Sequence, residues 1–314
     1  MNRDHLTRFA WLSIAAAIAT ITIKAAAWWL TGSVGLLSDA LESIVNLVAA
    51  GMTLWMLTLS ARPPSDEYAH GYSKAEYFGS GVEGALIFAA ALAMAWAAID
   101  RLFAPQPLER LGFGLCLSLV ATAINFAVSR VLRTVALRYR SIALEADASH
   151  LMTDVWTSVG VVIGVGAVAV TQWGWLDPVI ALAVAANIVV TGFMLVRRSA
   201  LGLLDRSVPG EQRSAIEAVL QRYRANGIEF HAVRTRAAAG RSFISMHMLV
   251  PGAWSVQQAH DLAEQIEHEI ALELPGASVL THIEPREDPA SYEDIELDRV
   301  HPSAIDSGST RITT

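Results

Sequence analysis

The chain has 314 residues, of which 53% are hydrophobic and 17% charged, and its mean hydropathy is +0.40. An apolar excess of this size excludes an ordinary soluble domain and indicates that part of the chain lies in lipid. The net charge of −7 is uneven, since residues 1–204 carry 13 basic and 13 acidic side chains, whereas residues 205–314 carry 10 and 17. We therefore expect a membrane part followed by a soluble, acidic part. An acidic balance argues against nucleic acid as a partner but leaves metal cations open.

Six apolar stretches are long enough to cross about 30 Å of hydrocarbon as helices. They run approximately from Phe9 to Leu30, Val34 to Leu59, Gly79 to Ile99, Leu111 to Ser129, Ile142 to Thr171 and Pro178 to Val196. Helices are expected because a barrel would need short alternating segments. Basic residues cluster in the loops on one side, so the positive-inside rule predicts a multi-pass protein of the inner (cytoplasmic) membrane with both termini in the cytoplasm.

Polar side chains interrupt the second and fifth stretches with the same spacing. They are Asp39, Glu42 and Asn46 in the second, and Asp147, His150 and Asp154 in the fifth. Positions i, i+3 and i+7 share one face of a helix. Cys116 is the single cysteine, so a metal here must be held by carboxylate and imidazole groups rather than thiolates. Two facing helices with such side chains can close a ligand shell around a first-row divalent ion.

Carboxylates within these apolar stretches carry a free-energy cost that another interaction must offset. Each carboxylate near the centre of a span costs roughly 2.5–3.5 kcal/mol, so the four acids together cost on the order of 10 kcal/mol. A bound cation offsets this cost; protonation, mutual pairing or a water-filled vestibule is the alternative. We predict a transport site at the pairs Glu42/Asn46 and His150/Asp154. For Asp39 and Asp147, orienting the neighbouring ligands or shaping the entrance is as good an interpretation as metal binding.

Two further motifs are Lys74-Ala75-Glu76-Tyr77 before the third stretch and Leu203-Leu204-Asp205-Arg206 after the sixth. With the six spans and the paired stripes, they resemble the cation diffusion facilitator family of divalent metal transporters, up to about Pro285. The resemblance implies that Glu42, Asn46, His150 and Asp154 are the four transport ligands. Glu42 and Asn46 depart from the family pattern, in which Asp or His is followed by Asp. Lys74 and Asp205 resemble an intersubunit charge pair.

The chain after Pro209 reads as helix, two strands, helix, strand. The expected strands are Ile228 to Arg236, Phe243 to Val250 and Ala277 to Ile283, and Ser255 caps a helix that runs to about Leu274. We therefore predict an α-helical membrane protein with six transmembrane helices (residues 1–204) and a small α+β domain of αββαβ order, ferredoxin-like or metallochaperone-like (residues 205–285). Residues 286–314 are polar and acidic without periodicity, which predicts a disordered tail.

Four histidines and one acid fall on this α+β frame. The resemblance implies that His231, His247, His260, His282 and Glu284 form a cytoplasmic regulatory site that binds two zinc ions, in a domain that pairs two protomers. Glu284 stands where the family has Asp. In the loop between the second and third stretches, Asp66 and His70 match poorly to a further metal site of some members, so a solvated loop is expected there.

The residues and the resemblance together predict a secondary active transporter rather than an enzyme, without an organic cofactor. It would export a divalent metal from the cytoplasm as a homodimer in the bilayer, in exchange for inward protons that compete for the same ligands. Zn²⁺ is the first candidate, and Fe²⁺, Co²⁺, Ni²⁺ or Mn²⁺ also suits an oxygen-rich shell. Two alternatives remain: an exporter of an organic cation, or a membrane-bound metal sensor or scaffold whose transport site has degenerated through Asn46.

Overall fold

The computed structural model describes residues 5–31, 34–103, 112–293 and 295. The chain divides into two compact units, which we call the helical unit (Met1–Asp205 with Ala238–Gly240) and the C-terminal unit (Arg206–Ala237 with Arg241–Thr314). Each unit is described by itself.

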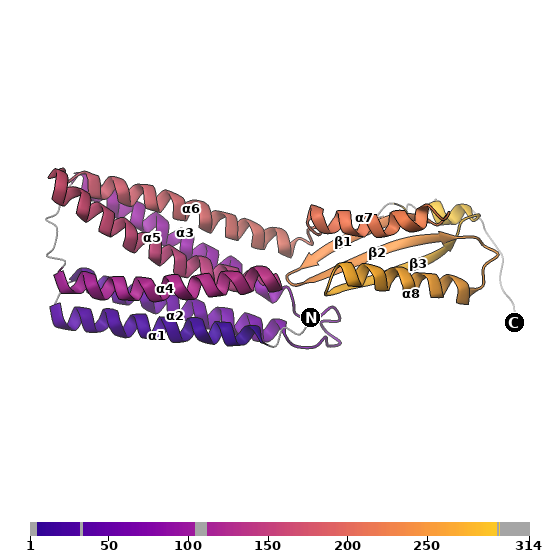
Figure 1. Cartoon of the computed structure of the whole chain (residues 1–314), viewed down its shortest axis with the longest axis horizontal. Coiled ribbons are helices and arrows are strands. Elements are labelled where there is room, and N and C mark those ends of the chain that lie inside the picture. The colour runs from indigo at the N-terminus through magenta and orange to yellow at the C-terminus, as the bar shows by residue number, and fades with distance from the viewer. Residues whose placement is uncertain (1–4, 32–33, 104–111, 294, 296–314) are drawn as a thin grey trace, which may run out of the picture. The chain divides into compact units, whose positions relative to one another are not determined.

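Six long helices make up the described part of the helical unit (Figure 1). They are α1 (Leu6–Thr31), α2 (Val34–Ser60), α3 (Ala75–Phe103), α4 (Gly112–Tyr139), α5 (Ile142–Thr171) and α6 (Leu176–Leu203). At 26 to 30 residues each, they reach about 40 Å at 1.5 Å per residue, which exceeds the hydrocarbon thickness of a bilayer.

Four of the described helices are long and apolar enough to cross a membrane, namely those that include Leu6–Ala26, Ala75–Phe103, Cys116–Tyr139 and Leu176–Leu203. In α2, the described residues include a shorter apolar stretch, Asn46–Ser60. Both α2 and α5 contain one of the polar stripes predicted from the sequence. The helical unit is therefore a membrane domain with four clearly apolar spans, and the six-span count remains a prediction.

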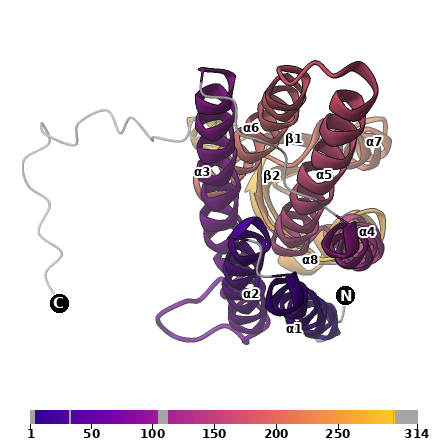
Figure 2. The ribbon, with the colours of Figure 1, turned by 90° about the vertical axis from the view of Figure 1, so that its left-hand side faces the viewer.

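The helices that carry the stripes pack against each other inside this bundle. Contacts link α1 with α2, α4 with α5, α1 with α4, and α2 with α5. On the other side, α3 lies along α6, as the end-on view of Figure 2 shows. Leu57 of α2, Leu132 of α4 and Leu144 of α5 belong to one buried cluster at the end of the bundle where α5 begins. This packing places the inward faces of α2, α4 and α5 toward one another.

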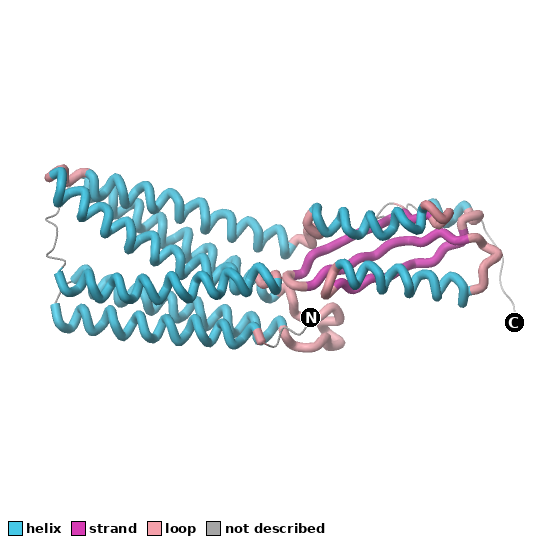
Figure 3. Tube along the Cα trace, viewed as in Figure 1, coloured by secondary structure: helices cyan, strands magenta, loops and turns pink. Residues whose placement is uncertain are grey.

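The C-terminal unit contains a three-stranded sheet with two helices (Figure 3). Its elements follow in the order α7 (Gly210–Arg224), β1 (Glu229–Ala238), β2 (Arg241–Val250), α8 (Val256–Glu273) and β3 (Ala277–Pro285). The strand order is β1-β2-β3, and β2 pairs in parallel with β3 so that His247 lies opposite His282. A capping box between Ser255 and Gln258 starts α8.

Both helices cover the same face of this sheet. Alternate residues of β2 (Ile244, Met246, Met248 and Val250) are buried in one core with side chains from α7 and α8. Because side chains alternate along a strand, the residues between them, including His247, lie on the opposite face. Val279 and Ile283 of β3 also pack on the core, so the even-numbered positions of β3 share the face of His247. The sheet therefore has one core face and one face available for polar chemistry.

The C-terminal end of the described chain differs from the prediction. Pro289–Tyr292 forms a 3-10 helix, capped by the side chain of Asp288, which accepts a hydrogen bond from the backbone of Ala290. Ser291 is buried and donates to the carbonyl of Pro285. Composition alone assigned these residues to a disordered tail, but the Asp-Pro pair supplies a local helix start. Residues 296–314 of the predicted tail lie outside the described residues.

Candidate metal centres

The first candidate centre lies in the helical unit, where the stripes of α2 and α5 meet. Nε2 of His150 is 2.5 Å from Oδ1 of Asn46, and Nδ2 of Asn46 donates a hydrogen bond to Oδ2 of Asp154. All three residues are buried: Asn46 is 4% exposed, and His150 and Asp154 are each 7% exposed. The structure thus brings together three of the four predicted transport ligands, although Asn46 is more than a hundred residues from His150 and Asp154 in the chain.

The fourth predicted ligand, Glu42, and its neighbour Asp39 have side chains outside the described residues. Their backbone belongs to α2, and Glu42 precedes Asn46 by four residues. Positions four apart lie above one another on a helix face. The assignment of Glu42 as a ligand therefore stays a prediction from spacing.

Asn125 of α4 is a contributor that the sequence reading missed. Its Nδ2 donates to Oδ2 of Asp154 at 3.1 Å, and the residue is buried. The only signal was an amide inside the apolar stretch from Leu111 to Ser129, with no polar stripe around it. Asp154 therefore accepts hydrogen bonds from amides on two different helices, which fixes the orientation of its carboxylate.

The chemistry of this group suits a divalent transition metal. It offers a carboxylate, an amide oxygen and an imidazole, and Nδ1 of His150 has no hydrogen-bond partner among the described residues. A buried ring nitrogen without a partner is uncommon because buried polar atoms are normally satisfied. Neutral imidazole and carboxylate are ordinary ligands of zinc and other first-row ions.

Asp147 points to a different neighbour. Its Oδ1 accepts a hydrogen bond from the hydroxyl of Ser13 on α1 at 2.9 Å. Seven residues, or two helical turns, separate Asp147 from Asp154 along α5.

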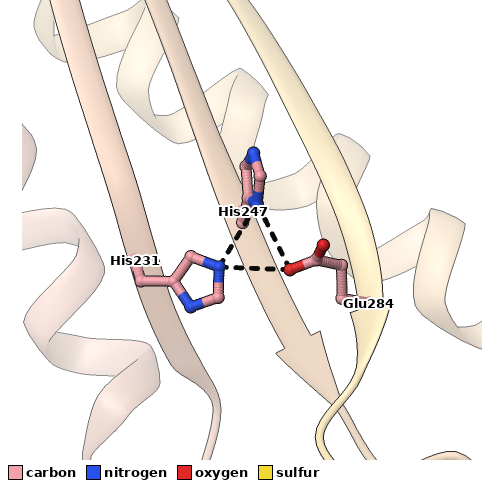
Figure 4. A group of neighbouring side chains, drawn as sticks. All are labelled: His231, His247 and Glu284. Carbon is pink, nitrogen blue, oxygen red and sulfur yellow. Dashed lines mark hydrogen bonds and ion pairs between the residues drawn. The ribbon is translucent and has the colours of Figure 1, made fainter. Parts of the chain in front are cut away.

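The second candidate centre lies on the open face of the sheet in the C-terminal unit. His231 of β1, His247 of β2 and Glu284 of β3 come from three adjacent strands and point toward one another (Figure 4). Nε2 of His231 lies 3.2 Å from Nδ1 of His247 and 3.1 Å from Oε2 of Glu284, and Nδ1 of His247 lies 3.2 Å from that same oxygen. The side chains of His231, His247 and Glu284 are 13%, 15% and 7% exposed, respectively.

These distances fit the ligand shell of one ion. A zinc ion with ligands at about 2.0–2.1 Å in tetrahedral geometry has ligand atoms roughly 3.3 Å apart. Hydrogen bonds alone do not explain why the two ring nitrogens and the carboxylate oxygen all lie close to one another. If both nitrogens donated to Glu284, their hydrogen atoms would repel each other across the short distance between the two rings. The donor set of two imidazoles and one carboxylate is also one that zinc uses. The residues therefore fit a metal ion.

The remaining predicted ligands of this centre divide into two cases. Nε2 of His282 lies 3.4 Å from Oε1 of Glu284, and the rings of His247 and His282 are 5.0 Å apart. Glu284 thus faces His231 and His247 with one oxygen and His282 with the other, an arrangement that can bridge two ions. His260 is exposed on α8, and the structure does not bring it into the group within this chain.

Lys74 and Asp205 form an ion pair at one end of the helical unit. Their Nζ and Oδ1 atoms are 2.8 Å apart, and Nζ also donates to the carbonyl of Leu203 at 3.3 Å. This pair is formed within one chain, whereas the resemblance implies a pair between subunits. Asp66 and His70 are both exposed in the loop after α2, as expected for a solvated loop.

Comparison with known proteins follows the same division of the chain. A family model described as "Cation efflux transmembrane domain" matches residues 10–204, and one described as "Cation efflux protein, cytoplasmic domain" matches residues 208–286. The chain belongs to the cation diffusion facilitator family. It is a multi-pass membrane protein of a cation transporter family, and its two candidate centres lie one in each matched domain.

Curated relatives extend over nearly the whole chain. An uncharacterised transporter of Synechocystis sp. is 50% identical over 296 residues, covering 94% of this chain and 95% of the relative. The cation-efflux pump FieF of Klebsiella pneumoniae is 30% identical over 291 residues (91% and 95%), and that of Yersinia pestis is 30% identical over 283 residues (88% and 93%). The similarity of this cation diffusion facilitator protein to these relatives therefore extends through both domains.

Proposed function

We propose that this protein exports a divalent transition metal, with Zn²⁺ as the first candidate, from the cytoplasm across the inner membrane. The observation that carries the proposal is the convergence of Asn46, His150 and Asp154 from two helices in the buried interior of a membrane domain. A buried carboxylate in a span costs roughly 2.5–3.5 kcal/mol, and a bound cation offsets that cost. The similarity to cation-efflux pumps supports the direction of transport.

Exchange for protons follows from the chemistry of the same ligands. Imidazole and carboxylate bind a metal only when they are deprotonated, so a proton that arrives at His150 or Asp154 competes with the ion. Protons that enter from outside would therefore release the metal on that side. Alternating access of the site would convert this competition into antiport.

The C-terminal unit, in this proposal, is a cytoplasmic metal-responsive domain. His231, His247 and Glu284 would hold one ion, and His282 with the second oxygen of Glu284 would contribute to another. Metal binding there would favour one arrangement of a homodimer, with Lys74 and Asp205 contributing to its register. Both termini would then be cytoplasmic, with residues 1–204 as the transport part and residues 205–285 as the responsive part.

An organic cation is a poorer substrate for this geometry. The pocket between α4 and α5 has a volume of about 420 Å³ and is lined by Leu119, Thr122, Ala123, Phe126, Met152, Val155, Trp156 and Val159. None of these residues is acidic, so the pocket offers no counter-charge. The carboxylates of Asp147 and Asp154 are instead buried in the interior of the bundle, where a small ion fits better than an organic molecule.

Transport into vesicles tests the proposal. The full-length protein is reconstituted with a pH gradient and a zinc-sensitive dye inside, and Asp154→Asn is compared with wild type. We expect zinc to enter the vesicles with the wild-type protein. The rate of entry should be at least about tenfold lower with the variant, because a carboxylate ligand is lost. Glu145→Gln, which removes a partly exposed acid of α5 that pairs with Arg198, is the matched control and should retain transport.

The outcomes also separate the alternatives. Wild-type protein that moves no zinc but binds it at the C-terminal unit would support the sensor or scaffold interpretation. Unchanged zinc entry in Asp154→Asn would remove the assignment of the transport site while leaving the family function intact.

A further inference from the structure

Buried or half-buried polar side chains repeat every seven residues along three helices of the helical unit. The sets are Asn46, Thr53 and Ser60 on α2, Glu76 and Glu83 on α3, and Asp147 and Asp154 on α5. Seven residues are two helical turns, or about 10 Å, so each set stays on one helix face. The candidate transport site occupies the first of three levels in this column, at Asn46 and Asp154. The last level joins Glu76 to Ser60 and Ser141 through hydrogen bonds of 3.3 and 2.6 Å.

The middle level holds two carboxylates from different helices. The hydroxyl of Ser13 donates to Oδ1 of Asp147 at 2.9 Å, and the hydroxyl of Thr53 donates to Oε2 of Glu83 at 3.3 Å. Glu83 and Asp147 are 2% and 1% exposed. The hydrogen bond from Ser141 to Glu76 joins the starts of α5 and α3, and Ala146 of α5 packs in one buried cluster with Tyr77 and Ile87 of α3, so two turns further along the helices Glu83 and Asp147 lie at the same level. We call Glu83 and Asp147 the middle carboxylate pair. Four helices (α1, α2, α3 and α5) supply this level.

Each member of the pair has one oxygen without a partner. Oε1 of Glu83 and Oδ2 of Asp147 are buried and make no hydrogen bond within the part of the chain that the structure describes. Buried acceptors are normally satisfied, and two neighbouring carboxylates in a membrane interior repel each other when both are ionised. At the last level, by contrast, serine hydroxyls reach both oxygens of Glu76. Among the described residues, these two oxygens of the middle level therefore have no hydrogen bond that compensates their burial.

We propose that Glu83 and Asp147 form a second cation-binding position inside the membrane domain, which takes a divalent metal ion on its path to or from the transport site. The hydroxyl donors fix one oxygen of each carboxylate and leave the other for the ion, while the hydroxyls of Ser13 and Thr53 provide further oxygen atoms nearby. Two carboxylates neutralise one divalent cation. An oxygen-only set without imidazole or thiolate suits hard ions such as Mn²⁺.

The position of the pair gives it a role in the proposed export. It lies about 10 Å from Asp154 along α5, between the transport site and the end of the unit where α2 ends and α3 and α5 begin. Its titratable neighbours along the column are Glu76 at the last level and Asp154 with His150 at the first level. This role rests on the proposed function, whereas metal binding at the pair can be measured without transport.

Counting bound Mn²⁺ tests the inference. The full-length protein in detergent carries Asp154→Asn and Glu284→Gln as a background, which weakens both centres described above. Equilibrium dialysis with elemental analysis, and the electron paramagnetic resonance of Mn²⁺, give the number of ions per chain. We expect one Mn²⁺ per chain in this background and its loss when Glu83→Gln and Asp147→Asn are added.

Controls keep the result interpretable. Glu76→Gln removes a buried carboxylate of the last level and should leave the Mn²⁺ count unchanged. Ser13→Ala and Thr53→Val keep both carboxylates and should weaken Mn²⁺ binding roughly 10- to 100-fold, as loss of supporting hydrogen bonds typically does. These two variants test the pair even if the charge-neutral double variant does not fold.

Two outcomes would overturn the inference. One is an unchanged Mn²⁺ count in a folded Glu83→Gln/Asp147→Asn protein. The other is a background protein that binds no Mn²⁺ and only takes up protons at the pair, which would make it a proton site. Failure of zinc export in vesicles would instead overturn the proposed function, since the Mn²⁺ count does not depend on flux.

Discussion

His150 on α5 makes a hydrogen bond through Nε2 to the amide oxygen of Asn46 on α2, across 2.5 Å. An amide oxygen only accepts, so Nε2 is the donor of this hydrogen bond, and Nδ1 has no hydrogen-bond partner among the described residues. The amide nitrogen of Asn46 in turn donates to Asp154. Asn46 therefore connects two proposed metal ligands at a position where the family resemblance leads one to expect a carboxylate.

Replacing Asn46 by Asp should raise the affinity of the site for divalent cations. An added negative charge a few ångströms from the ion is worth on the order of tenfold in affinity, even at a moderate effective dielectric constant. The same carboxylate must lose its proton before it binds, so the affinity should also fall more steeply as the pH is lowered. Competition between zinc and a chelating dye, measured between pH 6 and 8, follows both effects.

Asn46→Leu is the matched control for this change. It has a similar volume but removes both hydrogen bonds and supplies no ligand, so zinc affinity should fall. If Asn46→Leu and Asn46→Asp bound zinc as tightly as wild type, Asn46 would not belong to the ligand shell.

Glu284→Gln should weaken metal binding at the C-terminal unit by roughly 10- to 100-fold. The carboxylate oxygen lies 3.1 to 3.2 Å from ring nitrogens of His231 and His247, so the substitution removes the negative charge of the set while keeping its shape. Ligand that binds only the folded state stabilises it by RT ln(1 + [L]/Kd), and a tenfold change in Kd is worth about 1.4 kcal/mol. The shift of the thermal midpoint with added zinc measures the effect.

The exposed histidines of α8 provide the control for that measurement. His268→Gln changes an imidazole of α8 outside the predicted ligand set and should leave the zinc-induced shift unchanged. An equal loss in His268→Gln and Glu284→Gln would mean that the shift reports non-specific binding to surface histidines.

Tyr223→Phe should make the C-terminal unit less dependent on pH as well as less stable. The hydroxyl of Tyr223 donates to Oε1 of Glu269 at 2.6 Å, and this hydrogen bond lowers the pKa of Glu269 below 4.5. Burial, with the same hydrogen bond, raises the pKa of Tyr223 from 10.0 to about 12. At pH 7 we expect a loss of about 1 kcal/mol in the free energy of unfolding.

The sign of each shift sets the pH window of this effect. A lowered pKa of Glu269 contributes stability above pH 4.5 that is lost as the pH falls through its folded value, so the variant and wild type should converge in acid. A raised pKa of Tyr223 contributes stability below pH 10 that is lost as the pH rises toward 12. Urea unfolding from pH 3 to 11 measures both limbs. A constant difference across this range would contradict the assignment.

The repeated spacing of polar residues is the sequence signal from which the transport site is predicted. Residues at i, i+3 and i+7 share a helix face whatever the packing, so the spacing of His150 and Asp154 already carried the geometry. Asn125 and Glu83 were missed because each stands singly within an apolar stretch, and which helix faces meet is decided by packing between distant segments. Glu83 does follow Glu76 by seven residues, a signal that was available.

In the C-terminal unit, the order of elements agrees with the alternation and turn residues of the sequence. Which histidines converge depends on strand pairing, because the register that sets His247 opposite His282 is a property of the sheet and not of either strand. His260 lies on α8, which covers the other face of the sheet. Within the single chain it is therefore not near the ligands with which the family resemblance groups it. The 3-10 helix near Pro289 was missed because the prediction used the average composition of residues 286–314, which does not reveal a short helix that starts at a single Asp-Pro pair.

The Lys74–Asp205 pair should contribute little to the stability of the single chain. The side chains are 37% and 48% exposed, and ion pairs of this kind are typically worth 0–1 kcal/mol. Asp205 adopts a left-handed backbone with φ of 55°, which Asn also tolerates, so Asp205→Asn removes the charge without backbone strain. A double-mutant cycle of Lys74→Gln and Asp205→Asn should give a coupling energy of at most about 1 kcal/mol. A larger value that appears only at dimer-forming concentrations would place the pair at the proposed interface.

Glycine substitutions should distinguish the close contact of α3 with α6 from open positions elsewhere. A Cβ at Gly192 would lie 2.9 Å from the backbone nitrogen of Phe88 and 3.1 Å from the carbonyl oxygen of Gly84, so the helices would have to separate. Overpacking of this kind costs typically 1–3 kcal/mol. Gly192→Ala should therefore lower the thermal midpoint of the protein in detergent.

Gly51→Ala supplies the opposite case on α2. A Cβ there meets no atom within 4 Å, and alanine is favoured over glycine in a helix by up to about 1 kcal/mol. We expect an unchanged or slightly higher thermal midpoint for this variant, against a lower one for Gly192→Ala. Equal thermal midpoints for the two variants would show that α3 and α6 can separate without cost. Close packing of these two helices would then not stabilise the membrane domain.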